Sequence, residues 1–206
     1  MIVVARRTQE ETRSCILACA WDLFRQLGNR TTIADIAGKL GMSSANIYRF
    51  FPSKQALSEA VCASQLGGLA DAARLAASGP GGAGARIRGV LLTLYHGMRD
   101  QMVNDKRVHE VVNVAMQENW PSIDAFLQRS GALIGELIAQ GQRTGEFGPG
   151  DPASLGILTL QATILIHHPT NIAQCMGDDP DAEAEALIAF ALRALANKSA
   201  LQGAPR

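Results

Sequence analysis

Several features that define protein classes are scarce in this sequence. Its four Cys residues form no Cys-x-x-Cys pair and have no His at a zinc spacing, so neither a disulfide-rich scaffold nor a zinc finger is expected. The longest apolar stretch, residues 155–166, is too short to cross a membrane and contains Gly, Thr and Gln. No secretory signal peptide is apparent at the N-terminus. We therefore expect reduced thiols and a cytoplasmic location.

Net charge is missing as well. The 206 residues include 19 Lys and Arg against 19 Asp and Glu, so the formal net charge is zero. This balance argues against a uniformly basic nucleic-acid coat and against a polybasic membrane binder. By segment the balance is uneven: residues 1–60 carry eight basic and five acidic side chains, a net of +3, and residues 61–206 carry eleven and fourteen, a net of −3. A basic N-terminal end followed by an acidic remainder favours an approach to DNA through the N-terminal end.

Strand-like alternation of apolar and polar residues is also absent, and helical spacing dominates instead. The first clear example is an apolar stripe that stops before Gly28 and consists of Ile16, Cys19, Ala20, Leu23, Phe24 and Leu27. The sequence therefore predicts an all-α fold of about nine helices. We expect a three-helix, helix-turn-helix head in residues 1–54 and a larger helical domain in residues 55–206.

The larger domain is expected to begin with a long helix that leads out of the head, from Ser53 to about Ala76. A Gly-rich loop follows at residues 78–84. Later helices are expected at about 85–103, 105–118, 121–143, 153–168 and 180–198, with residues 167–171 interrupting or kinking the chain around Pro169.

Residues 32–51 have the layout of a helix-turn-helix. Thr31 or Thr32 can cap a short helix, Gly41 provides the turn, and Ser43 begins a second short helix. Two short helices joined at a Gly are common in helical proteins, so the surface chemistry of the second helix has to support the interpretation.

The second short helix has a polar outer face if Ile47 packs inward together with Ala45 or Phe50. The outward side chains are then hydroxyl, amide, phenol and guanidinium groups, which can reach phosphates or base edges in a major groove: Ser43, Ser44, Asn46, Tyr48 and Arg49. Ser53 and Lys54 begin the next helix, whose N-terminal end suits a phosphate.

A set of motifs is spread over residues 11–57. It includes Leu23-Phe24, Gly28, Thr31-Thr32, Ile36-Ala37, Gly41 and Ile47-Tyr48-x-x-Phe51-Pro52-x-Lys54. This combination resembles the DNA-binding head of the tetracycline-repressor (TetR) family of bacterial transcriptional regulators. Farther along the chain, Gly141-x-x-x-Gly145-Glu146-Phe147 is similar to a junction that is common in that family.

The resemblance implies roles for individual residues. Tyr48 and Lys54 would contact phosphates, and Thr32 would lie at a helix N-terminus near the DNA backbone. The part that reads bases would comprise Ser43, Ser44, Asn46 and Arg49, among which the Asn46 amide can pair with adenine through two hydrogen bonds. Ser44 stands where many members carry a basic residue, and Ala45 where Gly is frequent, so the operator sequence does not follow from the resemblance.

Other interpretations of these side chains remain open. The Tyr48 ring can pack in the head core with only its hydroxyl exposed, and Arg49 and Lys54 can be solvated surface charges. Arg6 and Arg7 precede the first helix, where they form either an arm for a minor groove or a solvated tail.

The larger domain is expected to hold a small-molecule pocket. Soft apolar side chains mixed with a few polar groups suit such a cavity, and the candidates are Tyr95, His96, Met98, Met102, His109, Asn113, Met116, Trp120 and Phe126. Each of them is also typical of an ordinary helix core or surface. The adjacent His167 and His168 would diverge on a helix and have no evident third ligand, so we expect no metal and no cofactor.

The last two predicted helices are apolar on more than one side, which indicates that something covers them. A two-fold partner is the commonest answer, and the candidate dimer residues are Leu155, Leu158, Ala162, Leu165, Leu187, Phe190, Ala191 and Leu195. Burial of the same residues within one subunit is the alternative. The resemblance to TetR regulators favours the dimer.

Together these observations favour a homodimeric transcriptional regulator, in the first instance a repressor. It would bind a palindromic double-stranded DNA operator and be released by an unknown small-molecule effector that prefers a conformation with mis-spaced heads. The alternative is a helical small-molecule-binding protein or enzyme with a vestigial DNA-binding head, although no catalytic motif is visible and we expect no enzyme. A third possibility is an architectural DNA-binding protein that has no effector.

Overall fold

The computed structural model describes residues 8–100, 106–175 and 177–196, and these residues form an all-α fold as predicted. The elements are α1 (Gln9–Leu27), η1 (Gly28–Arg30), α2 (Ile33–Leu40), α3 (Ser44–Phe50), α4 (Lys54–Ala76), α5 (Ala83–Met98), α6 (Lys106–Gln117), α7 (Pro121–Arg143), α8 (Pro152–Ala162), η3 (Ile164–Ile166), α9 (Pro169–Cys175) and α10 (Pro180–Leu195). Over the described ranges, extended pairing is confined to one antiparallel bridge between Phe147 and Ala196. No helix among them has the length and apolar character that a bilayer crossing requires.

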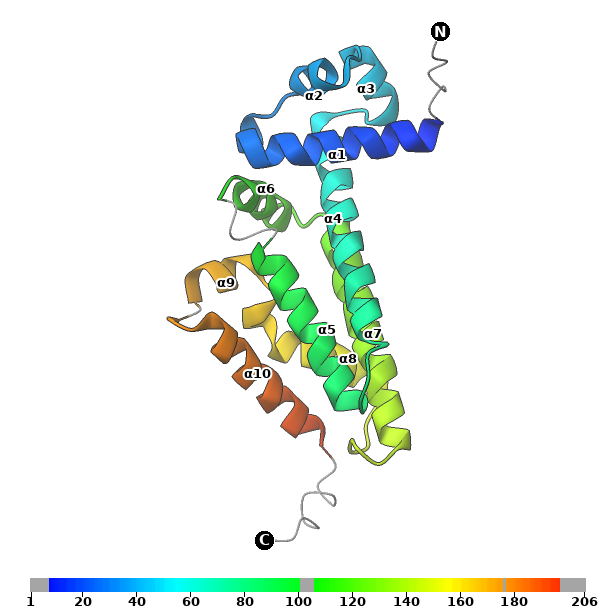
Figure 1. Ribbon diagram of the computed structural model, residues 1–206, viewed down its shortest axis with the longest axis vertical. Helices are drawn as coiled ribbons and strands as arrows, with labels where there is room; N and C mark the ends of the chain where they lie inside the picture. The colour runs from blue at the N-terminus through cyan, green and yellow to red at the C-terminus, as the bar shows by residue number, and fades with distance from the viewer. Residues whose placement is uncertain (1–7, 101–105, 176, 197–206) are drawn as a thin grey trace.

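The helices are arranged as a small head and a larger body joined by α4. Figure 1 shows α1, α2 and α3 grouped at one end, with α4 leaving the head and running alongside α7 into the body. The helix α5 packs against α4 and α7, and α10 packs on α5 at the edge of the body. The helix α6 lies between the two parts, because it contacts α1 and η1 as well as α4 and α9.

Local capping explains where the head helices begin. Thr8 and Glu11 form a capping box at the start of α1, and Thr32 and Asp35 form another at the start of α2. Thr32 is therefore the cap. Thr31 is buried, and its hydroxyl lies 3.1 Å from the Leu23 carbonyl oxygen and 2.9 Å from that of Gly28. The α2 helix ends at Gly41, which adopts the left-handed conformation (φ 65°) that the turn requires.

Two apolar cores hold the structure together. The head core is formed by Ile16, Leu17, Cys19, Ala20, Leu23, Phe24, Ile33, Ile36, Ala37, Ile47, Phe51, Leu57 and Val61. Because Leu57 and Val61 belong to α4, the first two turns of α4 are part of the head packing. The body core begins at Leu66 on the same helix and includes most of the inward faces of α5 and α7. A single rigid helix thus takes part in both cores, and the domain boundary at residue 54 stays a prediction.

The region after α8 differs from the expected helix over 153–168. The α8 helix ends at Ala162, a 3-10 turn follows, and α9 begins separately at Pro169, so the described residues contain ten α-helices, in line with the predicted number of about nine. Thr163 closes α8 with its hydroxyl 2.8 Å from the Thr159 carbonyl oxygen. Pro169 lacks an N–H group and disfavours helical geometry in the residue before it, so a new helix begins there.

The motif Gly141-x-x-x-Gly145-Glu146-Phe147 connects two helices of the body. A carboxylate remote in sequence caps α5, since the Glu146 oxygens accept hydrogen bonds of 2.8 Å from the backbone N–H groups of Ala83 and Gly84. The Phe147 ring is buried directly against Gly141, where any side chain would collide with it. Gly145 has φ +77°, which lets the chain turn between the two. The motif therefore fastens the end of α7 to the start of α5.

The helices α7 and α8 cross at very short range. Glycines line the crossing, and a Cβ atom on Gly135 would lie 2.8 Å from the Pro152 carbonyl oxygen. Gly156 lies across from it and would place a Cβ 2.6 Å from the Gly135 nitrogen. This close approach buries one face of α8 and leaves its opposite face outward.

Candidate functional site

The outer face of α3 is the first candidate site. Ile47 is fully buried on the inner face and Phe50 is half-buried beside it, whereas Ala45 is exposed, so Phe50 is the second inward residue. The Tyr48 side chain is 48% exposed, which excludes a ring packed in the head core. Arg49 is exposed next to it.

The first turn of α3 carries the remaining predicted base-reading residues. Ser43 is exposed and caps the helix, its hydroxyl oxygen accepting a 3.2 Å hydrogen bond from the Asn46 N–H. Asn46 and Ser44 are both half-buried. The capping bond uses the backbone N–H of Asn46, so it does not occupy the side-chain amide. That amide lies on the same short helix as Tyr48 and Arg49.

Two further predicted residues flank this face. The Thr32 hydroxyl donates to Asp35 Oδ2 at 2.7 Å and accepts from the Asp35 N–H at 3.2 Å, and the bond to its carboxylate lowers the pKa of Asp35. Lys54 is exposed in the first turn of α4 and donates from Nζ to the Asn29 carbonyl oxygen at 2.6 Å. An ammonium group has three donors, so Lys54 can hold Asn29 and still contact a phosphate.

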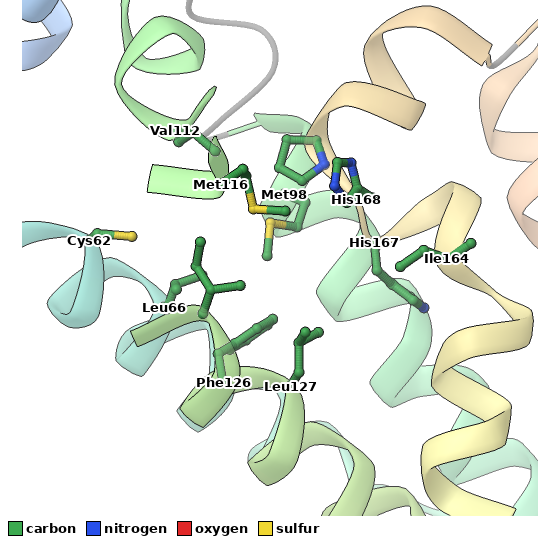
Figure 2. Close-up of a pocket in the computed structure, with 12 residues that line it drawn as sticks. Cys62, Leu66, Met98, Val112, Met116, Phe126, Leu127, Ile164, His167 and His168 are labelled. Carbon is green, nitrogen blue, oxygen red and sulfur yellow. The ribbon is translucent and has the colours of Figure 1, made fainter. Parts of the chain in front are cut away.

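The second candidate site is a cavity of about 50 Å³ in the body (Figure 2). It is enclosed by α4, α5, α6, α7 and the η3–α9 segment, and its lining residues are Cys62, Leu66, Met98, Val112, Met116, Ile123, Phe126, Leu127, Ile164, His167, His168 and Pro169. None of these twelve residues is Asp, Glu, Lys or Arg. Three of them, Met98, Met116 and Phe126, are among the residues that the sequence suggested for a pocket.

The other suggested pocket residues lie elsewhere. Tyr95 is buried, with its hydroxyl 3.3 Å from Arg99 Nη1, and burial raises the pKa of this phenol. The His96 ring lies 5.0 Å from the Tyr95 ring. Neither residue lines the cavity, because the end of α5 on which they lie presents only Met98 to it.

Four suggestions remain, of which three belong to α6 and the start of α7 and one lies outside the described residues. His109 and Asn113 lie one turn apart on α6, and Asn113 Oδ1 is 3.5 Å from the Thr170 hydroxyl of α9. Val112 and Met116, on a neighbouring face of α6, line the cavity instead. Trp120 is buried between the head and α6, and Met102 lies outside the described residues.

Nine cavity residues were missed at the sequence level. Most are ordinary apolar residues without a local signal, and the only distinctive segment among them is His167-His168-Pro169, which suggests a metal site rather than a cavity wall. No group of three or more His, Cys, Asp or Glu side chains that could hold a metal occurs in the described part of the chain.

The two histidines differ in orientation. The His167 ring turns away from the cavity toward α8, where its Nε2 atom lies 2.9 Å from the Thr163 hydroxyl, whereas the His168 ring faces the cavity near Met98 (Figure 2). The same hydroxyl lies 2.8 Å from the Thr159 carbonyl oxygen, so Thr163 joins the His167 ring to the backbone of α8. Burial lowers the pKa of His167 to about 3 and also lowers the pKa of His168. Both rings are therefore neutral at pH 7.

The predicted dimer residues divide into two groups. Leu158, Leu165 and Phe190 are 56%, 43% and 61% exposed, and Ala162 is exposed as well. Leu155 and Leu187 are half-buried against the body core. Ala191 and Leu195 are buried within the subunit, because they share the face of α10 that packs on α5, and so they do not belong to an outward surface.

A polar link joins the head to the body beside α6. Glu118 Oε2 accepts a 3.2 Å hydrogen bond from Gln55 Nε2 in the first turn of α4 and a 2.8 Å bond from Trp120 Nε1 at the start of α7. Asn119, between these two residues, has φ +50°, which is uncommon for a residue other than Gly. At the other end of α6, Arg107 donates to the Gln26 carbonyl oxygen at the end of α1.

Family models match both parts of the chain. The model described as bacterial regulatory proteins, tetR family, matches residues 16–61. The model described as tetracyclin repressor-like, C-terminal domain, matches residues 83–188, which is just over half of the chain. No curated protein matches the sequence.

Solved structures with the same fold include three regulators. A transcriptional regulator from Cytophaga hutchinsonii is 18% identical, with a TM-score of 0.73 over 90% of this chain and 99% of its own. RolR in complex with resorcinol is 18% identical, with a TM-score of 0.66 over 93% of this chain and 90% of the RolR chain. SmeT, the repressor of the Stenotrophomonas maltophilia multidrug efflux pump SmeDEF, is 15% identical. Its TM-score is 0.65 over 90% of this chain and 91% of the SmeT chain. At these identities the likeness shows the fold alone.

Proposed function

This chain belongs to the TetR family of bacterial regulatory proteins, and from this premise we propose that it binds a palindromic DNA operator as a homodimer and is released by a small-molecule effector. The observation that supports the proposal best is the outer face of α3. Its inner face holds the head core through Ile47, while Tyr48 and Arg49 point to solvent. Among the described residues, neither of these two side chains makes a hydrogen bond or an ion pair that would hold it to the head.

In the proposed complex, α3 enters the major groove and each side chain has a separate task. Asn46, Ser43, Ser44 and Arg49 face base edges, with the Asn46 amide the group best suited to adenine. Tyr48 and Lys54 contact phosphates on either side, and Thr32 lies near the backbone. The acidic remainder of the chain is repelled by DNA, so the head is the part that approaches it.

The proposed dimer uses the outward apolar surface of α8, η3 and α10. Leu158, Leu165 and Phe190 are too exposed to contribute to the core of one subunit, and a two-fold partner would cover them. The two recognition helices would then contact half-sites about 34–36 Å apart, or a multiple of that distance.

Effector response is proposed to pass through α4. The cavity contacts this helix at Cys62 and Leu66, about two and about three turns beyond Lys54. A ligand that enlarges the cavity therefore tilts the helix whose first turns belong to the head core. The effector lowers DNA affinity only to the extent that it prefers the tilted state. Two proteins of this fold are consistent with this proposal: RolR was solved in complex with resorcinol, and SmeT is the repressor of a multidrug efflux pump.

The proposal is tested by fluorescence anisotropy with DNA from the upstream intergenic region at several salt concentrations. Asn46→Ala is expected to reduce the preference for the operator over a scrambled duplex by about 10-fold or more. Lys54→Ala is expected to weaken both duplexes alike and to reduce the salt slope by about one. Gln128→Ala and Arg129→Ala make the same chemical changes on the body and should alter neither. Absence of salt-sensitive binding to any palindrome in that DNA would reject the proposal.

A further inference from the structure

The lining of the body cavity restricts the kind of molecule that it can hold. Nine of its twelve residues are apolar, and the other three are Cys62, His167 and His168. Burial raises the pKa of the Cys62 thiol and lowers the pKa of both histidines, so all three are neutral at pH 7. A charged ligand would lose its hydration without gaining an opposite charge, which is strongly unfavourable.

A polar atom that faces the cavity has no partner among the described residues. The Nδ1 atom of His168 is shielded from solvent and makes no hydrogen bond to this part of the chain, and the ring of His168 faces the cavity next to Met98 (Figure 2). The Nδ1 atom of His167 is also without a partner, but that ring points toward α8. A buried polar atom without a partner costs free energy, and a ligand that supplies the missing hydrogen bond recovers it.

The size of the cavity sets a further condition. A volume of about 50 Å³ is well below the ~150 Å³ of an apolar protein cavity that accommodates benzene, so a ligand needs additional room. Met98 and Met116 form part of the wall, and their unbranched side chains can change rotamer at low cost. A small ring or short chain fits after such a movement, whereas a large rigid molecule does not.

We propose that the effector is a small uncharged molecule with an apolar body and one hydroxyl group, and that His168 recognises the hydroxyl. A hydroxyl can donate to Nδ1 or accept from it, so it suits either tautomer of the neutral ring. The inference rests on the proposed effector role of the cavity, and it names the chemical class that this role requires.

The test compares three ligands that share one ring and differ in a single substituent: toluene, phenol and benzoate. Isothermal titration calorimetry of the full chain, without DNA, measures the affinity of each. Phenol is expected to bind about fivefold more tightly than toluene, the gain typical of one neutral hydrogen bond. Benzoate is expected to show no measurable binding. Equal affinity for phenol and toluene, or binding of benzoate as tight as that of phenol, would overturn the proposal.

Variants assign the preference to one side chain. His168→Phe should retain toluene binding, which shows that the cavity is intact, and reduce the advantage of phenol to less than about twofold. His96→Phe makes the same change outside the cavity and should keep the wild-type preference. An unchanged preference in His168→Phe would show that His168 is not the recognition group.

The outcome is separable from that of the proposed function. A chain that binds its operator but none of the three probes overturns the ligand class and leaves the operator proposal intact. A chain that binds phenol with the stated preference but binds no operator supports the ligand class and rejects the transcriptional role.

Discussion

The head and the body of this chain place their candidate functional residues in different ways. In the described part of the head, the candidate DNA-contacting residues lie between Thr32 and Lys54, on two short helices and the start of a third. In the body, the cavity wall draws residues from five helices and a 3-10 turn between Cys62 and Pro169. The head site therefore depends on local capping and spacing, and the body site depends on how distant helices pack. The two regions should respond differently to mutation, and the predictions below test that difference.

The largest expected effect concerns a buried histidine, and all four His residues of the chain lie in the body. The folded pKa of His167 is about 3 and the value for an unfolded His is about 6.5, so between these pH values the unfolded chain binds a proton that the folded chain does not. The contribution of His167 to the free energy of unfolding is therefore fully present above pH ~6.5. Below that pH the free energy of unfolding falls by about 1.4 kcal/mol per pH unit because of this residue.

His167→Leu should remove that contribution. Urea unfolding at pH 7.5, 6.0 and 5.0 measures the free energy of unfolding of both proteins, and the difference between their pH slopes isolates the histidine. Identical slopes would mean that His167 is protonated as readily in the folded chain as in the unfolded one.

The second prediction contrasts glycines in the two regions. Gly135→Ala places a Cβ atom 2.8 Å from the Pro152 backbone and should destabilise the protein by about 2 kcal/mol. Gly38→Ala in α2 meets nothing within 4 Å and should stabilise it by up to ~1 kcal/mol, because Ala favours a helix. Urea unfolding measures the change in the free energy of unfolding for each variant. Changes of opposite sign would support the close crossing of α7 and α8, and changes of the same sign would contradict it.

The third prediction compares a local cap with a remote one. Thr32→Ala removes a cap that lies three residues from its partner, and Glu146→Ala removes one that lies more than sixty residues from α5. Each should cost about 1 kcal/mol of unfolding free energy. Glu136→Ala is the control and should have little effect, because within the described residues Glu136 makes only an exposed 3.9 Å ion pair with Arg74. An unchanged free energy of unfolding in Glu146→Ala would show that α5 needs no remote cap.

The smallest expected effect lies at the junction of the two regions. Glu118 and Gln55 are both exposed, so their hydrogen bond should contribute only about 0.5 kcal/mol. A double-mutant cycle with Gln55→Ala and Glu118→Ala measures this coupling in thermal or urea unfolding. Additive single effects would mean that the hydrogen bond between Gln55 and Glu118 does not stabilise the junction.

Prediction from the sequence was most successful where neighbouring residues decide the outcome. The helix-turn-helix, the cap at Ser43 and the turn at Gly41 all follow from residue types a few positions apart. The choice between Ala45 and Phe50 as the inward residue needed the structure, because both lie on faces that are compatible with the helical period. In the body, the sequence suggested three of the twelve cavity residues, since Met and Phe at helical spacing are typical of any core.

The sequence by itself determined the helical class, the helix-turn-helix and the polar outer face of its second helix, because capping, turn geometry and helical periodicity act over a few residues. Only the tertiary structure decided that His168 faces a cavity while His167 faces α8, that Ala191 and Leu195 are inside the subunit, and that Glu146 caps α5. These placements depend on how whole helices cross and on how closely their backbones approach. Such distances are set by packing between residues far apart in the chain, which no local pattern records.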